Sequence, residues 1–517
     1  MTDQGRLAGP LSLSVANLCR RLQPQVSPRT AAGFAEVMRR LSAPLQVAVA
    51  GRIKSGKSTL VNALIGRRVA PTDVGECTRL VTRFQYGTVD RVEVVFTDGH
   101  KQVLPFAADG MIPAELGADI SKVSHIEAYL TNAVLEDMTV IDTPGLGSLD
   151  AASVSRTEEL LGAATRKDTG AGEIGELDPT SRNAVAGAEA VLYVVTQGVR
   201  ADDQQALAAF TAATASREAG PVNAIAVLNK ADTIPAESVQ GAESGEGDPV
   251  WRAAEILAEK QAALLKPRVA DVLPVIGLIA ESAEAGGFTS ADAETLRQLS
   301  KLDDPTLDTM LLGADIFTTW DCEVPSGTRL RLLEKLDLYG VRRAIEAIRA
   351  EPEITAGALR RMLLEVSGLA AVRARLNVVF AARADGIKAA AALASVTALA
   401  HASGDPAERQ RVHDAIEVLL AKPEAHQLRL LEALTVVAAG AVDMPEDLAE
   451  EVLRVGSNAD IDAQLGMPGA ARPELAAHAL ERAGWWRSFA SFGATPAQSR
   501  VAHVVHRSYF LIWQQLR

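Results

Sequence analysis

The sequence predicts a mostly parallel α/β domain joined to an all-α helical bundle. Two observations lead to this prediction. Between residues 44 and 325, short buried-strand patterns alternate with helical stretches, which is typical of a parallel sheet with flanking helices. Before and after that region, apolar residues recur at helical spacing. We therefore expect N-terminal helices over residues 1–43, an α/β domain over 44–350 and a helical domain over 351–517.

Composition limits the classes of function. The chain has 517 residues, a formal net charge of −13 and a pI near 5.3. An acidic surface argues against nucleic acid as the main partner, because binding phosphates requires a basic one. The three cysteines, Cys19, Cys77 and Cys322, have no motif spacing, so we expect a reducing, cytoplasmic compartment. No secretion signal and no apolar run of ~18–20 residues is evident, so any membrane contact should be peripheral.

The expected elements follow from hydrophobic periodicity. Buried-strand patterns occur at 45–50, 92–96, 138–141, 191–195, 224–228 and 272–276. Helical patterns occur twice within 10–42, then at 330–350, in one long segment from 369 to 402, and at 406–421, 424–440, 445–456 and from Thr495 onward. Two polar, Gly/Glu-rich stretches, 165–180 and 236–250, read as surface insertions.

The first strand pattern ends in a phosphate-binding motif. Residues 51–58, Gly-Arg-Ile-Lys-Ser-Gly-Lys-Ser, match G-x-x-x-x-G-K-[ST] and precede a helical stretch. The glycines let backbone N–H groups turn toward phosphates, Lys57 adds a cation at the β- and γ-phosphates, and the Ser58 hydroxyl suits magnesium. The pattern does not choose between ATP and GTP. The residues predicted to contact nucleotide here are Gly51, Lys54, Ser55, Gly56, Lys57, Ser58 and Thr59.

A second motif, Asp142-Thr-Pro-Gly145, ends the 138–141 strand. An acidic residue at a strand end can hold a magnesium-bound water, and the Gly145 N–H can sense the γ-phosphate. The same four residues also make a good turn, so alone they are not diagnostic. Between the two motifs, Thr78 lies in a loop that can close onto magnesium; the alternative is a solvated loop. The predicted magnesium ligands are Ser58, Thr78 and, through water, Asp142.

A third motif decides the base. Residues 229–232 read Asn-Lys-Ala-Asp and follow the 224–228 strand. The Asp232 carboxylate can accept hydrogen bonds from guanine N1–H and its exocyclic amine, a donor pair that adenine lacks. Asn229 and Lys230 complete the motif, and a backbone N–H after the next strand, from Gly277, is placed to reach guanine O6. The sequence therefore predicts GTP, bound with Mg²⁺, rather than ATP.

Together these motifs resemble the dynamin superfamily, and specifically the bacterial dynamin-like proteins of the actinobacterial isoniazid-inducible type. The similarity is carried by residues 51–66, 69–72, 76–79 and 142–145, by Asn229-Lys-Ala-Asp and by Leu338-Tyr-Gly-Val-Arg. The resemblance implies a dynamin-type GTPase domain at 44–350, with the helices of 1–43 and 351–517 packed as neck and stalk. It also implies hydrolysis of GTP to GDP and phosphate, GTP-driven self-association through GTPase domains, pairing with a second dynamin-like subunit, and remodelling of the inner face of the plasma membrane.

Two departures from the dynamin pattern indicate slow intrinsic turnover. Ile53-Lys54 stands where dynamins carry Gln-Ser, and Leu146 stands where Ras-like proteins place a water-orienting glutamine. Lys54 can supply the charge that dynamins are thought to take from a bound monovalent cation, which would make it catalytic together with Lys57 and Thr78. The alternative is a solvated lysine that steers nucleotide inward.

The sequence leaves the role of the helical region open. A competing class is a regulatory GTPase of ribosome or division-site assembly that uses the helical domain for docking. Residues 470–517 hold six arginines against two acids, which suits anionic lipid as well as RNA. In the same region four aromatics, Trp485, Trp486, Phe489 and Phe492, either contact a membrane interface or pack inside a helical bundle.

Overall fold

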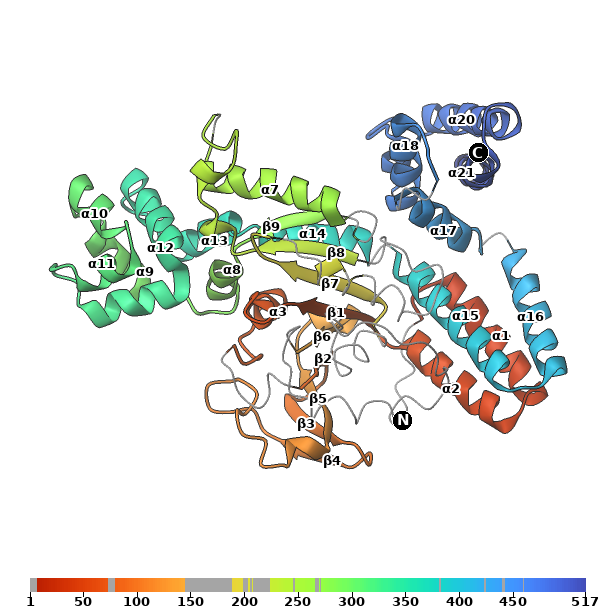
Figure 1. Ribbon diagram of the computed structural model, residues 1–517, viewed down its shortest axis with the longest axis horizontal. Coiled ribbons are helices and arrows are strands. Elements are labelled where there is room, and N and C mark those ends of the chain that lie inside the picture. The colour runs from red at the N-terminus through yellow and green to blue at the C-terminus, as the bar shows by residue number, and fades with distance from the viewer. Residues whose placement is uncertain are drawn as a thin grey trace, which may run out of the picture.

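The computed structural model places an α/β domain at the centre of the chain and helices on either side of it (Figure 1). It describes residues 7–72, 80–144, 188–198, 203–204, 207, 224–244, 247–265, 269, 271–380, 383–422, 425–438, 442–458 and 460–517. The chain therefore has the predicted fold class, a mostly parallel sheet followed by many helices. Among the described residues, no helix is both long and apolar enough to span a bilayer.

The central sheet has nine strands in the order β4-β3-β5-β2-β6-β1-β7-β8-β9. The strands are β1 (Leu45–Gly51), β2 (Thr82–Tyr86), β3 (Arg91–Phe96), β4 (Lys101–Leu104), β5 (Val123–Leu130), β6 (Met138–Asp142), β7 (Ala190–Val195), β8 (Ala224–Asn229) and β9 (Val272–Val275). The run from β6 through β1 to β9 is parallel, whereas β2 joins β6, and β3 joins β5 and β4, in antiparallel pairs. All six predicted strands are confirmed.

The helices occupy both faces of the sheet and extend beyond it. They are α1 (Pro10–Leu22), α2 (Pro28–Ser42), α3 (Lys57–Ile65), α4 (Val134–Asp137), α7 (Pro249–Leu265), α8 (Gly277–Glu284), α9 (Ser290–Leu299), α10 (Asp304–Met310), α11 (Ala314–Thr319), α12 (Ser326–Ala350), α13 (Ala356–Val366), α14 (Leu369–Val379), α15 (Ala384–Ala402), α16 (Pro406–Leu420), α17 (His426–Ala438), α18 (Glu446–Ser457), α19 (Ile461–Leu465), α20 (Arg472–Phe492) and α21 (Pro496–Leu516). Thr495 caps α21 with a reciprocal capping box, as its sequence predicts.

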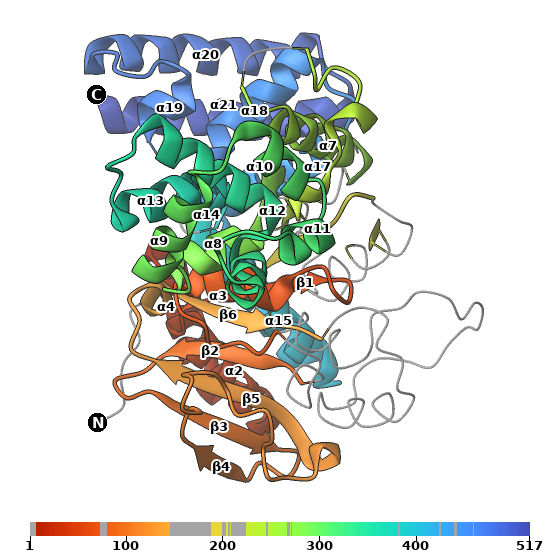
Figure 2. The same cartoon turned by 90° about the vertical axis from the view of Figure 1, so that its left-hand side faces the viewer.

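Four buried apolar clusters organise the molecule. One joins α3 and α14 to one face of the sheet, and a second joins α7, α8, α12 and α13 to the other. The third holds α1, α2, α15 and α16 together, so the N-terminal helices pack with the C-terminal half of the chain. The fourth is built from α17 to α21, which form a separate bundle near the C-terminus (Figures 1 and 2).

The packing bears on the domain limits. Leu359 and Leu363 of α13, and Leu369 and Val372 of α14, lie in the sheet clusters rather than in the helical bundles. Helices just beyond residue 350 therefore pack as part of the α/β core. The limits 1–43, 44–350 and 351–517 stay predictions.

Several elements differ from expectation. The long helix predicted over 369–402 is two helices, because α14 ends at Val379 and α15 begins at Ala384. Helices α9, α10 and α11 form a lobe at one end of the sheet (Figure 1), in a region from which we predicted no separate helical unit. The stretch 165–180 lies outside the described residues. Of 236–250, the part that is described contains a short 3-10 turn and the start of α7.

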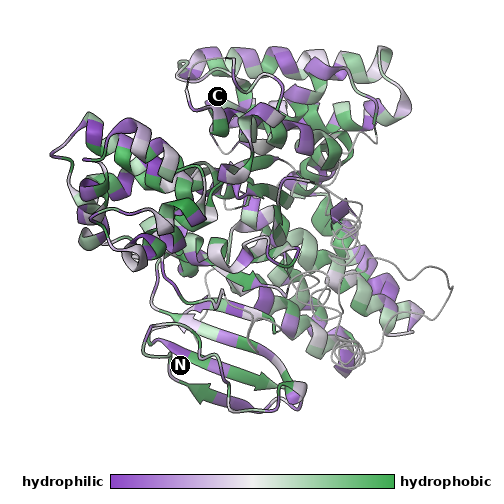
Figure 3. Cartoon of the chain, turned by 60° about the vertical axis from the view of Figure 1, so that its left-hand side comes forward, coloured by the Kyte–Doolittle hydropathy of each residue, from purple (hydrophilic) through white to green (hydrophobic). Residues whose placement is uncertain are grey.

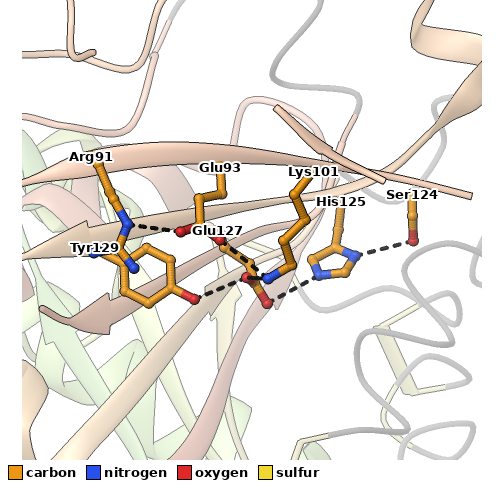
Figure 4. A network of polar contacts seen from close by, with 7 residues as sticks. All are labelled: Arg91, Glu93, Lys101, Ser124, His125, Glu127 and Tyr129. Atoms are coloured by element: carbon orange, nitrogen blue, oxygen red, sulfur yellow. Dashed lines mark hydrogen bonds and ion pairs between the residues drawn. The ribbon is translucent and has the colours of Figure 1, made fainter. Parts of the chain in front are cut away.

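The outer strands carry polar as well as apolar residues (Figure 3), and a polar network lies on one face of β3, β4 and β5 (Figure 4). Glu127 accepts hydrogen bonds from the Lys101 ammonium at 2.8 Å and the Tyr129 hydroxyl at 3.0 Å. Arg91 bonds Glu93 at 2.7 Å and lies 3.8 Å from the centre of the Tyr129 ring. Cross-strand polar pairs thus stabilise this face.

Candidate nucleotide site

The predicted phosphate loop joins β1 to α3 at the carboxyl edge of the parallel strands. Gly51 has φ 151° and Gly56 has φ 87°. A Cβ at Gly51 would lie 2.4 Å from the Val194 carbonyl oxygen, and one at Gly56 would lie 2.3 Å from the Asn229 amide nitrogen. Both positions therefore need glycine, for the backbone conformation and for the close approach of neighbouring strands. This is the geometry in which a loop presents its N–H groups to phosphate.

Lys57 is folded onto the loop that precedes it. Its ammonium donates to the carbonyl oxygens of Gly51 at 3.0 Å and Arg52 at 2.8 Å, and the residue is 8% exposed. Burial lowers the pKa of Lys57 to about 8, partly offset by the negative charge of Asp142. An anion in the loop would replace two carbonyl contacts with an ion pair, which favours the charged lysine.

Ser58 and Asp142 meet although they lie far apart in the chain. The Ser58 hydroxyl donates to Asp142 Oδ2 at 2.8 Å, while Asp142 Oδ1 is buried and has no hydrogen-bond partner among the described residues. Burial raises the pKa of Asp142 to about 6, against the opposing effects of Lys57 and Ser58. A buried carboxylate oxygen without a donor, next to a hydroxyl, suits a hard cation such as Mg²⁺. Within the described residues, no larger cluster of acidic, histidine or cysteine ligands is present.

Asn229 connects the phosphate loop to the 229–232 motif and to the start of α8. Its amide nitrogen donates to the Ser55 carbonyl in the phosphate loop at 2.8 Å. Its amide oxygen accepts from the backbone N–H of Lys230 and of Gly277, each at 2.9 Å. Asn229 is 2% exposed, so these bonds form in a dry interior. One side chain therefore fixes the relative positions of the phosphate loop, the 229–232 motif and the start of α8.

Asp232, the residue predicted to recognise guanine, follows Asn229 closely in the chain. Lys230 has φ 60°, a left-handed conformation that is unusual for a lysine, and Asp232 follows in a short 3-10 turn. Burial and, to a smaller extent, the negative charge of Asp337 raise the pKa of Asp232 to about 6. Asp337 was not predicted as a site residue, because it lies more than a hundred positions along the chain and belongs to no nucleotide-binding motif.

The remaining predicted residues are placed as follows. Thr59 lies in the first turn of α3. Lys54 is exposed with φ 60°, and no described residue forms a hydrogen bond or ion pair with its ammonium. Ile53 beside it is 46% exposed. Thr78, Gly145 and Leu146 lie outside the described residues, so their placement stays a prediction.

A strand, a glycine loop with a buried lysine, and a serine beside a strand-end carboxylate define a P-loop nucleotide-binding protein. Residues 47–231 match the model of the Dynamin family. The isoniazid-induced protein IniC of Mycobacterium tuberculosis is 30% identical over 454 residues, covering 87% of this chain and 85% of its own length. The chain therefore belongs to the dynamin family, a family of GTPases.

Other similarities are shorter or more distant. A bacterial dynamin-like protein of Nostoc punctiforme is 29% identical over 116 residues, or 20% of this chain and 17% of its own length. A solved structure of an oligomerised bacterial dynamin pair, described as a mechanism for long-range sensing and tethering of membranes, aligns with 97% of this chain. That alignment covers 90% of the solved chain, with a TM-score of 0.34 and 12% identity.

Proposed function

We propose that this chain binds GTP with Mg²⁺ at the site described and hydrolyses it to GDP and phosphate, using hydrolysis to drive self-association and peripheral membrane remodelling. The observation that carries the nucleotide part is the position of Asn229, which holds the phosphate loop and the guanine motif in one register. Gly51, Ser55, Gly56, Lys57 and Thr59 would cradle the phosphates. Asp232 would accept hydrogen bonds from guanine. The Gly277 N–H now donates to Asn229, and it would lie near guanine O6 when the bound base competes with Asn229 for it.

The residues suited to Mg²⁺ are Ser58 and, through water, Asp142, with Thr78 closing from its loop. Bound there, the ion would neutralise charge on the β- and γ-phosphates. Lys57 would hold the same phosphates from the loop side, and the Gly145 N–H would respond to the γ-phosphate. Lys54 is our candidate for the remaining positive charge, because its ammonium is paired with no described residue and its left-handed backbone belongs to the phosphate loop.

Slow intrinsic turnover follows from the residues that surround the reaction. Ile53 offers no group that could orient water, and Leu146 offers none either. The position of the attacking water would then be set by the backbone of Thr78 after its loop closes. Self-association through GTPase domains, with a second copy or with a second dynamin-like subunit, is the step that would complete this arrangement.

The membrane part of the proposal rests on the bundle of α17 to α21. Trp485 stacks on Phe489 with ring centres 5.4 Å apart, Arg482 lies 4.4 Å from the Trp485 ring, and Phe492 is 94% exposed. Exposed rings beside arginines suit the headgroup region of an anionic bilayer, on the inner face of the plasma membrane. Trp486 does not belong to this surface, because it is fully buried and donates to Glu451 at 3.0 Å.

Nucleotide selectivity tests the first part. The unaltered protein should bind GDP and GTP far more tightly than ADP and ATP, and Asp232→Asn should exchange guanine for xanthine preference. Removing hydrogen bonds to a charged acceptor should cost ~3–5 kcal/mol, hence several hundredfold in affinity. Equal binding of GTP and ATP by the unaltered protein would refute the assignment.

Partner binding tests the second part. The full chain should float with liposomes that contain anionic lipid, more strongly with a non-hydrolysable GTP analogue than with GDP. It should not sediment with ribosomes. Sedimentation with ribosomes and no flotation would instead support an assembly GTPase whose helical domain is a docking module.

A further inference from the structure

A buried carboxylate joins three helices of the C-terminal bundle, α18, α20 and α21 (Figure 1). It belongs to Glu451, which is 7% exposed. Its Oε1 accepts hydrogen bonds from the Trp486 indole N–H at 3.0 Å and the Tyr509 hydroxyl at 2.5 Å. The Arg482 guanidinium donates to both carboxylate oxygens, to Oε1 from Nε at 2.8 Å. Burial favours the neutral form, but these donors hold the pKa of Glu451 below its ordinary value, so the group is charged at neutral pH.

Two of these three donors also support aromatic rings at the surface. The Arg482 guanidinium lies 4.4 Å from the centre of the Trp485 ring. The Trp486 ring meets Trp485 at 5.3 Å and Phe489 at 5.9 Å, in both cases edge to face. Such contacts have preferred geometries, so they fix the orientation of the rings they touch. Glu451 is therefore connected to Trp485 and Phe489 through Arg482 and Trp486.

The supported rings form part of an apolar strip on α20. Trp485 and Phe489 stack with their planes 8° apart, and Phe492 follows three residues later on the same side of the helix. Trp485 is 40% and Phe492 94% exposed, and Phe489 is half-buried. A ring that is already held in its binding orientation loses little conformational entropy when a partner covers it. The strip is thus preorganised for binding.

The contacts of Arg482 determine how it can serve that strip. Its charge is neutralised by Glu451, one face covers the Trp485 ring, and only 22% of its side chain is exposed. A lipid phosphate would have to displace a buried carboxylate to reach it. Arg487 and Arg500, by contrast, are exposed near the end of α20 and the start of α21. Rings on one helix side with exposed cations nearby match a bilayer interface, where apolar chains lie beneath anionic headgroups.

We propose that Glu451 and Arg482 are positioning residues that hold Trp485 and Phe489 outward for entry into the interfacial layer of a bilayer, and that Arg482 is no ligand of lipid phosphate. This inference rests on the membrane part of the proposed function. It assigns lipid charge to the exposed arginines and ring orientation to the buried ion pair. Its consequence is specific, because a buried carboxylate then contributes to lipid binding.

The first test is Glu451→Gln in the full chain, with flotation on liposomes of phosphatidylcholine and phosphatidylglycerol. The amide keeps an acceptor for Trp486 and Tyr509, but its own N–H group faces Arg482 and releases it. Lipid partitioning should fall about fivefold, the cost of ordering a ring on binding. This fold loss should stay the same as the phosphatidylglycerol fraction rises. If Arg482 were a phosphate ligand, its release would strengthen flotation instead.

The second test is Arg482→Lys, which keeps the charge but loses the two-point contact with Glu451 and the planar stack on Trp485. It should also lower partitioning about fivefold. A matched control is Arg472→Lys at the other end of α20, where the arginine donates to the carbonyl oxygens of Leu516 at 2.9 Å and Gln515 at 3.1 Å.

A control for bundle stability is Ser508→Ala, which removes a 2.8 Å contact with His426. Both controls should float as the unaltered protein does, whatever their thermal midpoints.

The outcomes separate this inference from the function on which it rests. Unchanged or stronger flotation of Glu451→Gln, or full flotation of Arg482→Lys, overturns the positioning role. Equal losses in the two controls overturn it as well, because general loosening of the bundle would then explain every result. If the unaltered chain does not float, or if Trp485→Ala floats equally well, the membrane assignment is wrong and this inference fails with it.

Discussion

Replacing Asn229 by alanine should uncouple the phosphate loop from the guanine motif. The side chain makes three hydrogen bonds, to the Ser55 carbonyl and to the N–H groups of Lys230 and Gly277, and it is 2% exposed. Alanine leaves three backbone groups without this partner. A buried group that loses its partner costs ~1–3 kcal/mol, so we expect a loss of ~3–5 kcal/mol in the free energy of unfolding, after partial access by water.

Part of this loss should appear in nucleotide binding. Without the Asn229 side chain, the Ser55 backbone is free to move relative to Asp232. Nucleotide binding must then first restore the relative positions of the phosphate loop and the 229–232 motif. We expect the dissociation constant for GDP to rise by at least tenfold. The assay is fluorescence titration with labelled GDP, together with hydrogen exchange at the Gly277 amide, which should exchange faster in the variant.

A matched control is Asn132→Ala. Asn132 also makes two hydrogen bonds to backbone, to Ile65 at 2.7 Å and from Val134 at 2.9 Å, but these lie at the far end of α3 from the phosphate loop. This variant should lose stability while keeping its affinity for GDP. If Asn229→Ala binds GDP as tightly as the unaltered protein, or if both variants lose affinity equally, Asn229 does not hold the motifs in register.

Three further outcomes are expected. Lys54→Ser should lower turnover well beyond any change in GTP affinity, with partial restoration by potassium; a change in affinity alone would make Lys54 a steering residue. Trp486→Ala should cost ~3–5 kcal/mol of stability, whereas Trp485→Ala should leave the thermal midpoint nearly unchanged and weaken flotation on anionic liposomes. The contacts of Glu127, above all with His125, hold its pKa well below the ordinary range. The ionised Glu127 therefore stabilises the folded protein fully above pH ~4.3, and this contribution is lost as the pH falls further. Glu127→Gln should therefore be less stable than the unaltered protein at pH 7, with the difference shrinking in acid.

The parallel core of the fold could be predicted from the sequence because its strands are buried on both faces. β7 and β8 are buried at every position, and such runs stand out in a sequence. β5 was missed because partly buried polar positions interrupt its apolar ones. The partners His125 and Tyr129 of Glu127 lie on β5 itself, whereas its partner Lys101 lies on β4. The stabilising pairs become visible only when these strands are brought together.

The break between α14 and α15 has a similar cause. Leu369, Val372 and Leu376 continue at helical spacing into the alanine-rich segment, so periodicity alone indicates one helix. In the structure, α14 and α15 pack against different parts of the protein. Residues of α14 pack on the sheet, whereas Ala389 and Val396 of α15 pack on the N-terminal helices. Two partners in different directions require a change of axis that no local signal records.

At the nucleotide site, the motifs were predictable and their costs were not. Asp142 Oδ1 and Ser55 Oγ are buried and have no hydrogen-bond partner in the part of the chain that the structure describes, and Lys54 and Lys230 have left-handed backbones. Each feature lowers the free energy of unfolding of the nucleotide-free protein, and ligand binding could offset that loss. A phosphate, a hard cation and a guanine base supply the acceptors, charge and donors that these groups lack. Unsatisfied polar groups and strained backbone thus coincide with residues that the motifs predict to contact nucleotide.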